Sequence, residues 1–141
     1  MAKNSTLSCL EKRDLLNQAA VSIDTLVRWG EQYEAMGLVH DAVDFFAKAH
    51  ASEAIERLLP IALEEGDLFL FKRLCRFLGR EITRDEWLQL AAKAEEQGKF
   101  RFAAEAYRSA GDEDMAGALL NRASVQTLEA AGSRAEEVEI A

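Results

Sequence analysis

The sequence is poor in residues that break helices or hold metals: it has one proline, two cysteines and two histidines among 141 residues. Scarce proline disfavours an architecture of short strands and tight turns, and abundant alanine, leucine and glutamate favour helices. Cys9 and Cys75 form no CxxC pair, so we expect two small buried side chains in a reducing compartment. His40 and His50 have no further ligand at metal-binding spacing. No metal site and no cofactor is therefore predicted.

Long apolar runs and catalytic motifs are also missing. The most apolar segment, 68–78, is much shorter than a membrane span and carries Lys72, Arg73 and Arg76. The N-terminal residues reach charge before any apolar run develops, so no signal peptide is predicted. There is no glycine-rich phosphate loop and no nucleophile beside a plausible base. These absences predict a soluble, cytoplasmic protein that is not an enzyme.

Positive charge is in short supply as well. The chain has 17 Lys and Arg against 25 Asp and Glu, which gives a net charge of −8 at pH 7. A chain this acidic is a poor candidate for binding nucleic acid or anionic lipid over its whole surface. Its 49% hydrophobic and 30% charged residues are typical of a folded chain. Its length fits one domain with one core.

What the sequence does contain is an internal repeat. When it is shifted against itself by 61 positions, residues 24–62 align without gaps with residues 85–123. Glycines, alanines and leucines coincide in the two windows, including Gly37 with Gly98. Apolar residues three or four apart before and after each glycine predict two helices joined by a glycine turn. Glycine suits the turn because it readily takes the positive φ that ends a helix.

These helix pairs resemble the tetratricopeptide repeat, whose pattern is W-x2-L-G-x2-Y and then A-x3-F in about 34 residues. The first copy reads Leu26-x2-Trp29-Gly30-x2-Tyr33, then Ala42-x3-Phe46, and the second reads Trp87-x2-Leu90-Ala91-x2-Ala94, then Ala103-x3-Tyr107. A small residue, Gly30 or Ala91, is expected to let the paired helices approach closely. A degenerate pair lies between the copies and turns at Gly66. The proline that usually closes each repeat is absent, and short links between repeats and turns such as Ala110-Gly111-Asp112 resemble the α-solenoids of coat and intraflagellar-transport proteins.

The resemblance implies an all-α fold, a right-handed α–α superhelix of about seven to eight antiparallel helices. A single helical-repeat domain is predicted over residues 1–131. Its parts are an N-terminal helix at 6–20, repeats at 23–51, 52–83 and 84–112, and a capping helix at 113–131. The remaining residues, 132–141, are predicted to form a mobile acidic tail.

In this family the first helix of each pair lines the concave face, so the resemblance implies that partner-binding residues lie there. They are Asp24, Val27, Glu31, Glu34, Glu53, Glu56, Asp85, Leu88 and Glu95, with Pro60, Leu63 and Ala92 beside them. Most are acidic and none is basic, so the groove is predicted to attract a basic or amphipathic segment of another protein. The alternative is an ordinary solvated face whose acids lie near helix N-termini.

Three further features leave alternatives open. A group of cations either forms a basic outer patch for an acidic partner or a second copy, or extends beside an apolar helix. These cations are Lys72, Arg73, Arg76, Arg80, Lys99, Arg101 and Arg108. Residues 68–71 are either buried between helices or exposed as a binding patch. Pro60 is expected to kink or split the helix at 52–65.

Together these features predict a non-catalytic protein–protein interaction module that acts as an adaptor, a scaffold or a chaperone-like holder. The alternative is a structural subunit of a larger assembly, joined through the ends of the solenoid and the helix at 68–78. The predicted partner is a protein with a basic or amphipathic segment. Nucleic acid and membranes are not expected as partners, and a homo-oligomer is compatible with both functions.

Overall fold

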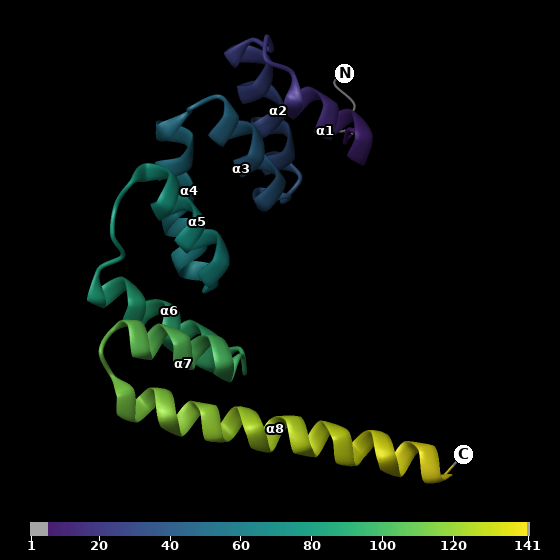
Figure 1. The fold of residues 1–141 in the computed structure, drawn as a ribbon, viewed down its shortest axis with the longest axis vertical. Coiled ribbons are helices and arrows are strands. Elements are labelled where there is room, and N and C mark those ends of the chain that lie inside the picture. Colours follow the sequence, from purple (N-terminus) through teal and green to yellow (C-terminus); the bar gives the residue numbers. More distant parts are fainter. Residues whose placement is uncertain (1–5, 141) are drawn as a thin grey trace. The chain divides into compact units, whose positions relative to one another are not determined.

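The chain folds into α-helices throughout the part that the structure describes. The structure is a computed structural model that describes the backbone of residues 6–140 and the side chains of residues 6–134. Within this range there are eight helices and no strand, which confirms the all-α prediction. The helices are α1 (Cys9–Asn17), α2 (Ile23–Ala35), α3 (Val39–Lys48), α4 (Ser52–Glu65), α5 (Leu68–Leu78), α6 (Arg84–Glu96), α7 (Phe100–Ser109) and α8 (Glu113–Ile140) (Figure 1).

Glycine turns separate the paired helices at the positions that the repeat predicts. Gly37 lies between α2 and α3 with φ 77°, and Gly98 lies between α6 and α7 with φ 72°. In both turns the amide after the glycine donates back to a carbonyl of the preceding helix, at 3.0 Å and 2.8 Å. This bond and the positive φ end the helix and reverse the chain. The predicted repeat starts coincide with the first residues of α2, α4, α6 and α8.

By its contacts the chain divides into two compact units. Unit 1 comprises Met1–Leu59 with Arg73–Arg80, and unit 2 comprises Pro60–Lys72 with Glu81–Ala141. Each unit takes part of α4 and part of α5. The single domain over residues 1–131 stays a prediction. The expected split at Pro60 does not occur, because α4 continues through it to Glu65. Pro60 lacks the amide hydrogen for one helical bond, and the boundary between the units falls directly before it.

In unit 1 the core lies between α2 and α3, and Gly30 permits their close approach. A Cβ placed on Gly30 would lie 2.5 Å from Cε1 of Phe46, whose side chain is fully buried. The Tyr33 ring packs on that of Phe45, with 5.3 Å between centroids. The close approach predicted at this small residue is therefore confirmed.

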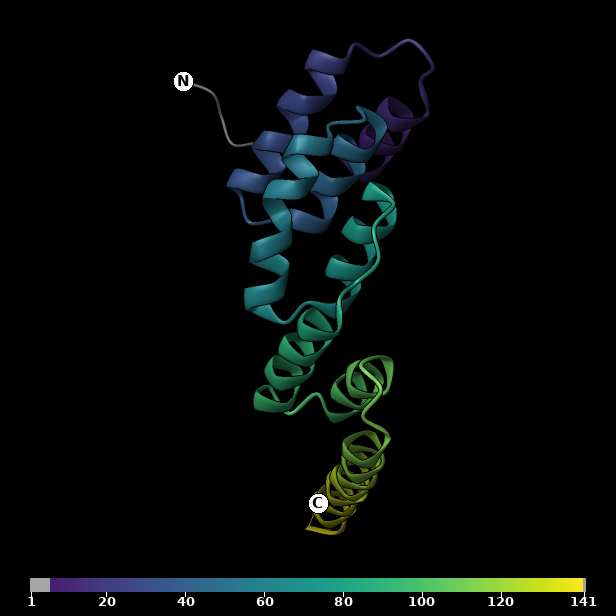
Figure 2. The same ribbon diagram turned by 90° about the vertical axis from the view of Figure 1, so that its left-hand side faces the viewer.

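The first helix, α1, is drawn in the darkest purple in Figure 2. It contacts α3 but contributes no buried residue to unit 1. It is shorter than the predicted 6–20. Ser8 begins it with a capping box, in which its hydroxyl accepts from the Glu11 amide and the Glu11 carboxylate accepts from the Ser8 amide. The backbone is extended at Gln18, which ends the helix.

In unit 2, α7 packs against both α6 and α8 (Figure 1). The buried centre of this packing consists mainly of alanines, joined by Leu119, and the rings of Phe100 and Tyr107 lie against it. The alanines are Ala94, Ala103, Ala104 and Ala116. Such small side chains allow three helices to pack closely, and the aromatic rings fill the remaining space.

The last helix is longer than expected. The sequence predicted a capping helix to residue 131 and a mobile tail beyond it, whereas α8 continues to Ile140. Its later residues are mainly Ala, Glu and Arg, which are good helix formers, and a single glycine at 132 costs only about 1 kcal/mol. Ala141 lies outside the described residues. Across residues 6–140, none of the helices is long and apolar enough to span a bilayer.

Candidate functional site

Unit 1 contains a cleft of about 700 Å³ between α2 and the start of α4. Its walls come from α2, from the turn after α3 and from the first turns of α4. The lining residues are Val27, Glu31, His50, Ala51, Ser52, Glu53, Ala54 and Arg57. Three of them, Val27, Glu31 and Glu53, were predicted from the sequence to bind a partner. The cleft is the place where the structure brings predicted residues together within one unit.

The helical period explains how the cleft acquires its chemistry. Val27 and Glu31 are four residues apart on α2, and so are Glu53 and Arg57 on α4, so each pair lies on one helical face. Glu31 and Glu53 are exposed, and among the described residues neither carboxylate takes part in an ion pair. Val27 is half-buried and gives the wall an apolar surface.

Arg57 does not neutralise these carboxylates, because its charge is already paired. Its guanidinium lies 2.5 Å from Oε2 of Glu34 on α2. Glu34 was predicted to be a free acid in the groove, and the structure instead makes it the partner of Arg57. The cleft therefore keeps the negative charge of Glu31 and Glu53, with an apolar contact at Val27.

His50 lines the cleft in an unusual backbone conformation. Its φ is 53°, and it is the non-glycine residue with positive φ in the described range. Gly111 takes the same place in the second copy of the repeat, with φ 89°. The His50 ring lies 6.3 Å from that of Phe77 between centroids. Sequence reasoning considered His50 only as a possible metal ligand, although its alignment with Gly111 at the 61-residue shift was visible in the sequence.

The other predicted residues of unit 1 lie outside the cleft lining. Asp24 is exposed in the first turn of α2, where it favours the helix through its charge near the N-terminus. Glu56 is exposed on α4 and is not among the lining residues. These acids match the alternative of an ordinary solvated face.

In unit 2 the predicted residues are not gathered into one cavity. Asp85 is exposed in the first turn of α6, and Leu88 is half-buried. Glu95 accepts a hydrogen bond of 3.1 Å from the hydroxyl of Tyr107 and lies 3.7 Å from Arg122. Partial burial and the Glu95 carboxylate raise the pKa of Tyr107. Glu95 is thus engaged within its own unit.

A second cavity, of about 470 Å³, lies in unit 2 beside an exposed aromatic pair. Phe69 on α5 and Phe102 on α7 meet edge to face, with 5.2 Å between centroids and 83° between planes. Phe69 is 58% exposed, whereas Leu68, Leu70 and Phe71 are buried. Residues 68–71 therefore combine the two alternatives, with three buried side chains and one exposed ring.

Several of the clustered cations are paired within their own unit. Lys72 lies 2.7 Å from Glu105, and Arg108 lies 3.4 Å from Glu113. Arg73 pairs with Asp44 of α3 and donates to the backbone carbonyl of His40 at 3.2 Å. These contacts reduce the positive charge that the segment offers to a partner.

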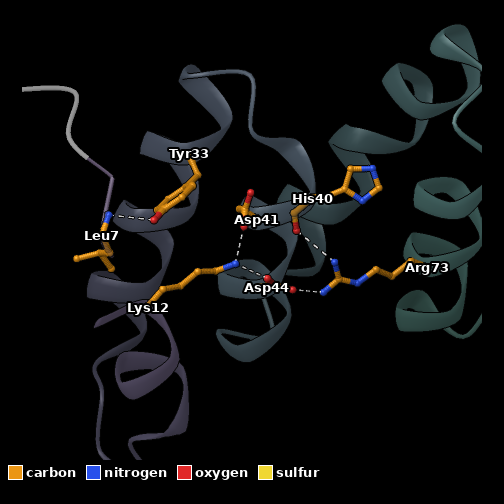
Figure 3. Close-up of polar contacts among 7 residues, drawn as sticks. All are labelled: Leu7, Lys12, Tyr33, His40, Asp41, Asp44 and Arg73. Carbon is orange, nitrogen blue, oxygen red and sulfur yellow. Dashed lines mark hydrogen bonds and ion pairs between the residues drawn. The ribbon is translucent and has the colours of Figure 1, made fainter. Parts of the chain in front are cut away.

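Lys12 of α1 reaches the carboxylates of Asp41 and Asp44 (Figure 3) and lies near two aromatic rings of unit 1. Its Nζ lies 2.6 Å from both Asp41 and Asp44, and 6.0 Å and 5.9 Å from the ring centroids of Tyr33 and Phe45. Burial lowers the pKa of Lys12, but the two carboxylates outweigh it and the net change is upward. We call these four acceptors, Tyr33, Asp41, Asp44 and Phe45, the lysine seat.

One acid of the lysine seat, Asp44, is held by a second cation. Asp44 also pairs with Arg73 of α5, which reaches it from the side away from Lys12 (Figure 3). Burial would raise the pKa of Asp44, but hydrogen bonds from Lys12 and Arg73 outweigh it and lower the value. Sequence reasoning missed this cluster because its members are far apart in the chain and were assigned to different helices.

No group of histidine, cysteine, aspartate and glutamate suited to a metal ion is found among the described residues. Cys9 is exposed and Cys75 is buried, so the expectation of two buried thiols holds for Cys75 only. Comparisons with protein-family models, with curated proteins and with solved structures find no match to this chain.

Proposed function

We propose that this chain is a non-catalytic protein–protein interaction module with a right-handed, tetratricopeptide-like arrangement of helix pairs. Its partner is a basic or amphipathic segment of another protein. The observation that carries the proposal is the unit 1 cleft, where the unpaired carboxylates of Glu31 and Glu53 lie beside the apolar side chain of Val27. An adaptor, a scaffold and a chaperone-like holder would each use such a site.

The cleft favours a cation for an electrostatic reason. Its one cationic lining residue, Arg57, is paired with Glu34, so a lysine or arginine of a partner would meet two unpaired carboxylates and no unpaired cation. Exposed ion pairs contribute at most about 1 kcal/mol each, so each carboxylate is worth roughly a factor of five in affinity. The apolar contact at Val27 suits a segment that alternates basic and apolar side chains.

The test is a fluorescence anisotropy titration with a labelled helical peptide that has lysines on one face and leucines on the other. Its control peptide carries glutamate in place of each lysine. The wild-type chain is expected to bind the basic peptide and not the acidic one. Glu31→Gln and Glu53→Gln should each weaken binding about three- to fivefold. Equal binding of the two peptides would refute the proposal.

A matched variant controls for the overall loss of charge. Glu64 is an exposed residue of α4, like Glu53, but it does not line the cleft. Glu64→Gln should therefore leave the affinity for the basic peptide unchanged. If Glu64→Gln weakens binding as much as Glu53→Gln, the attraction is a property of the net charge and not of the cleft.

The alternative function, a structural subunit of a larger assembly, is favoured by the exposed pair of Phe69 and Phe102 in unit 2. Exposed aromatic rings are typical anchors of protein interfaces. Sedimentation velocity over a hundredfold range of concentration should then show a rising mass that Phe69→Ser abolishes. A constant monomeric mass for the wild-type chain would count against self-assembly through this pair.

A further inference from the structure

Helix α1 is attached to unit 1 through polar contacts and not through a buried apolar face. No residue of α1 is buried, and Leu10 is 62% exposed. Its connections are the Lys12 ion pairs in the lysine seat, a Leu7 amide that donates to the Tyr33 hydroxyl at 3.0 Å, and a bond from Lys48 to the Leu16 carbonyl. These bonds are part-buried, and a helix with so little buried apolar surface opens more readily than a core helix.

The lysine seat belongs to the rest of unit 1. Tyr33 and Phe45 are 3% and 0% exposed, so they are fixed in the core between α2 and α3. Asp44 is oriented by Arg73 of α5. Removing α1 would leave the packing of Tyr33 on Phe45 and the Asp44–Arg73 ion pair in place, so these parts of the seat would remain formed. What it would lose is an ammonium group between two carboxylates and two rings.

This chemistry selects for lysine on a helix. Two carboxylates at 2.6 Å supply charge-assisted hydrogen bonds. The two ring centroids are 6.0 Å and 5.9 Å from Nζ, at the outer limit of a cation–π contact. The ammonium reaches them from a helix that lies against α3. A partner that presents a lysine from an amphipathic helix would reproduce every one of these interactions.

We propose that the lysine seat is a docking site for a lysine-bearing helix of another protein, and that α1 occupies this site in the free chain as an internal competitor. The partner helix displaces α1 and places its own lysine between Asp41 and Asp44. This site is separate from the unit 1 cleft, and Glu31 and Glu53 take no part in it. Tethering gives α1 an effective concentration in the millimolar range, so release of α1 sets the apparent affinity for the partner.

The experiment uses the full chain and a fluorescent peptide with the sequence of residues 6–20 as the probe helix. Lys12→Ala in the protein weakens the hold of α1 and leaves the seat intact. The peptide is expected to bind this variant at least about tenfold more tightly than the wild-type chain, because charge-assisted bonds of the competitor are lost. Arg13→Ala, which changes the neighbouring exposed cation, should bind the peptide no better than wild type.

Two further titrations identify the seat as the site. A peptide that carries alanine in place of its lysine should bind the Lys12→Ala protein at least about tenfold more weakly. Adding Asp41→Asn to that protein should weaken binding of the unchanged peptide, since Asp41 contacts Lys12 alone among the ion pairs described. Circular dichroism should show that each variant retains its helices. Glu31→Gln should leave this binding unchanged, which separates the result from the cleft.

Other outcomes overturn the proposal. Equal binding of the peptide to the wild-type and Lys12→Ala chains would show that α1 does not compete for its site. Equal binding of the peptides with lysine and with alanine would show that the seat does not recognise an ammonium. If light scattering shows that Lys12→Ala abolishes a wild-type dimer, the occupant is a second copy of this chain and not another protein.

Discussion

Replacing Gly30 by alanine tests how closely α2 and α3 are packed. An added Cβ would lie 2.5 Å from Cε1, 2.7 Å from Cδ1 and 3.0 Å from Cζ of Phe46. The Phe46 ring is 0% exposed, so it has no solvent to turn into. The clash must be relieved by a shift of the ring or of the helices. Alanine is a better helix former than glycine, so the substitution improves the helix propensity of α2 while it worsens the packing on Phe46.

The packing cost and the gain in helix propensity together decide whether Gly30→Ala lowers or raises the free energy of unfolding. Overpacking a close-packed core costs about 1–3 kcal/mol, and we expect the upper end because the ring is enclosed. Alanine gains about 1 kcal/mol over glycine in a helix interior. The free energy of unfolding of unit 1 should therefore fall by about 2 kcal/mol. The second copy has Ala91 where the first has Gly30, and Tyr107, which takes the place of Phe46 at the 61-residue shift, is only half-buried.

Urea denaturation provides the assay, with the fluorescence of Trp29 as the reporter of unit 1 in a Trp87→Phe background. Gly117→Ala is the matched control, because Gly117 lies within α8 and a Cβ there would meet no atom within 4 Å. Circular dichroism should show that Gly117→Ala stabilises unit 2 by up to about 1 kcal/mol. If Gly30→Ala is as stable as wild type or more so, the close packing of Gly30 on Phe46 is wrong.

Three more substitutions test individual features. His50→Gly should raise the free energy of unfolding by about 0.5–1 kcal/mol in urea denaturation, because glycine takes a positive φ without strain; a loss would mean that the contact with Phe77 matters more. The lowered pKa of Asp44 means that its ion pairs stabilise unit 1 above about pH 4 and that this stability is lost as the pH falls. The urea midpoint of Asp44→Asn should consequently vary less than that of wild type between pH 6 and pH 2.5. Thr83→Ala should cost unit 2 about 1 kcal/mol in the same assay, because its hydroxyl caps the Glu86 amide; an unchanged midpoint would mean that water replaces the cap.

The fold was predictable wherever local rules determine it. Apolar period and glycine turns placed the helix pairs, since a positive φ at Gly37 or Gly98 is a local requirement. The ends of the chain were less predictable. The sequence predicted an N-terminal helix at 6–20, but α1 attaches through Lys12 and stops at Asn17. A glycine at 132 did not end α8, because one unfavourable residue does not outweigh good helix formers on both sides.

The candidate site was predictable only in part, because pairing between helices depends on tertiary packing. The helical period placed Val27 and Glu31 on the face that lines the cleft. Nothing in the sequence indicates that Glu34 would pair with Arg57 from the next helix pair, 23 residues away. For the same reason the lysine seat could not be anticipated, because its acids and rings come from α2 and α3 and its cation comes from α1.

The division of the chain at Leu59 and again at Arg73 has a consequence for synthesis. Unit 1 needs Arg73–Arg80, which leave the ribosome after Pro60–Lys72 of unit 2. Asp44 and Arg73 are 29 residues apart, so at about 5–20 residues per second roughly 1–6 s pass between their additions. During that interval Asp44 waits for Arg73, and Lys12 of α1 is the cation already available to it. The nascent chain would thus close α1 onto α3 before the second half of its ion-pair network exists.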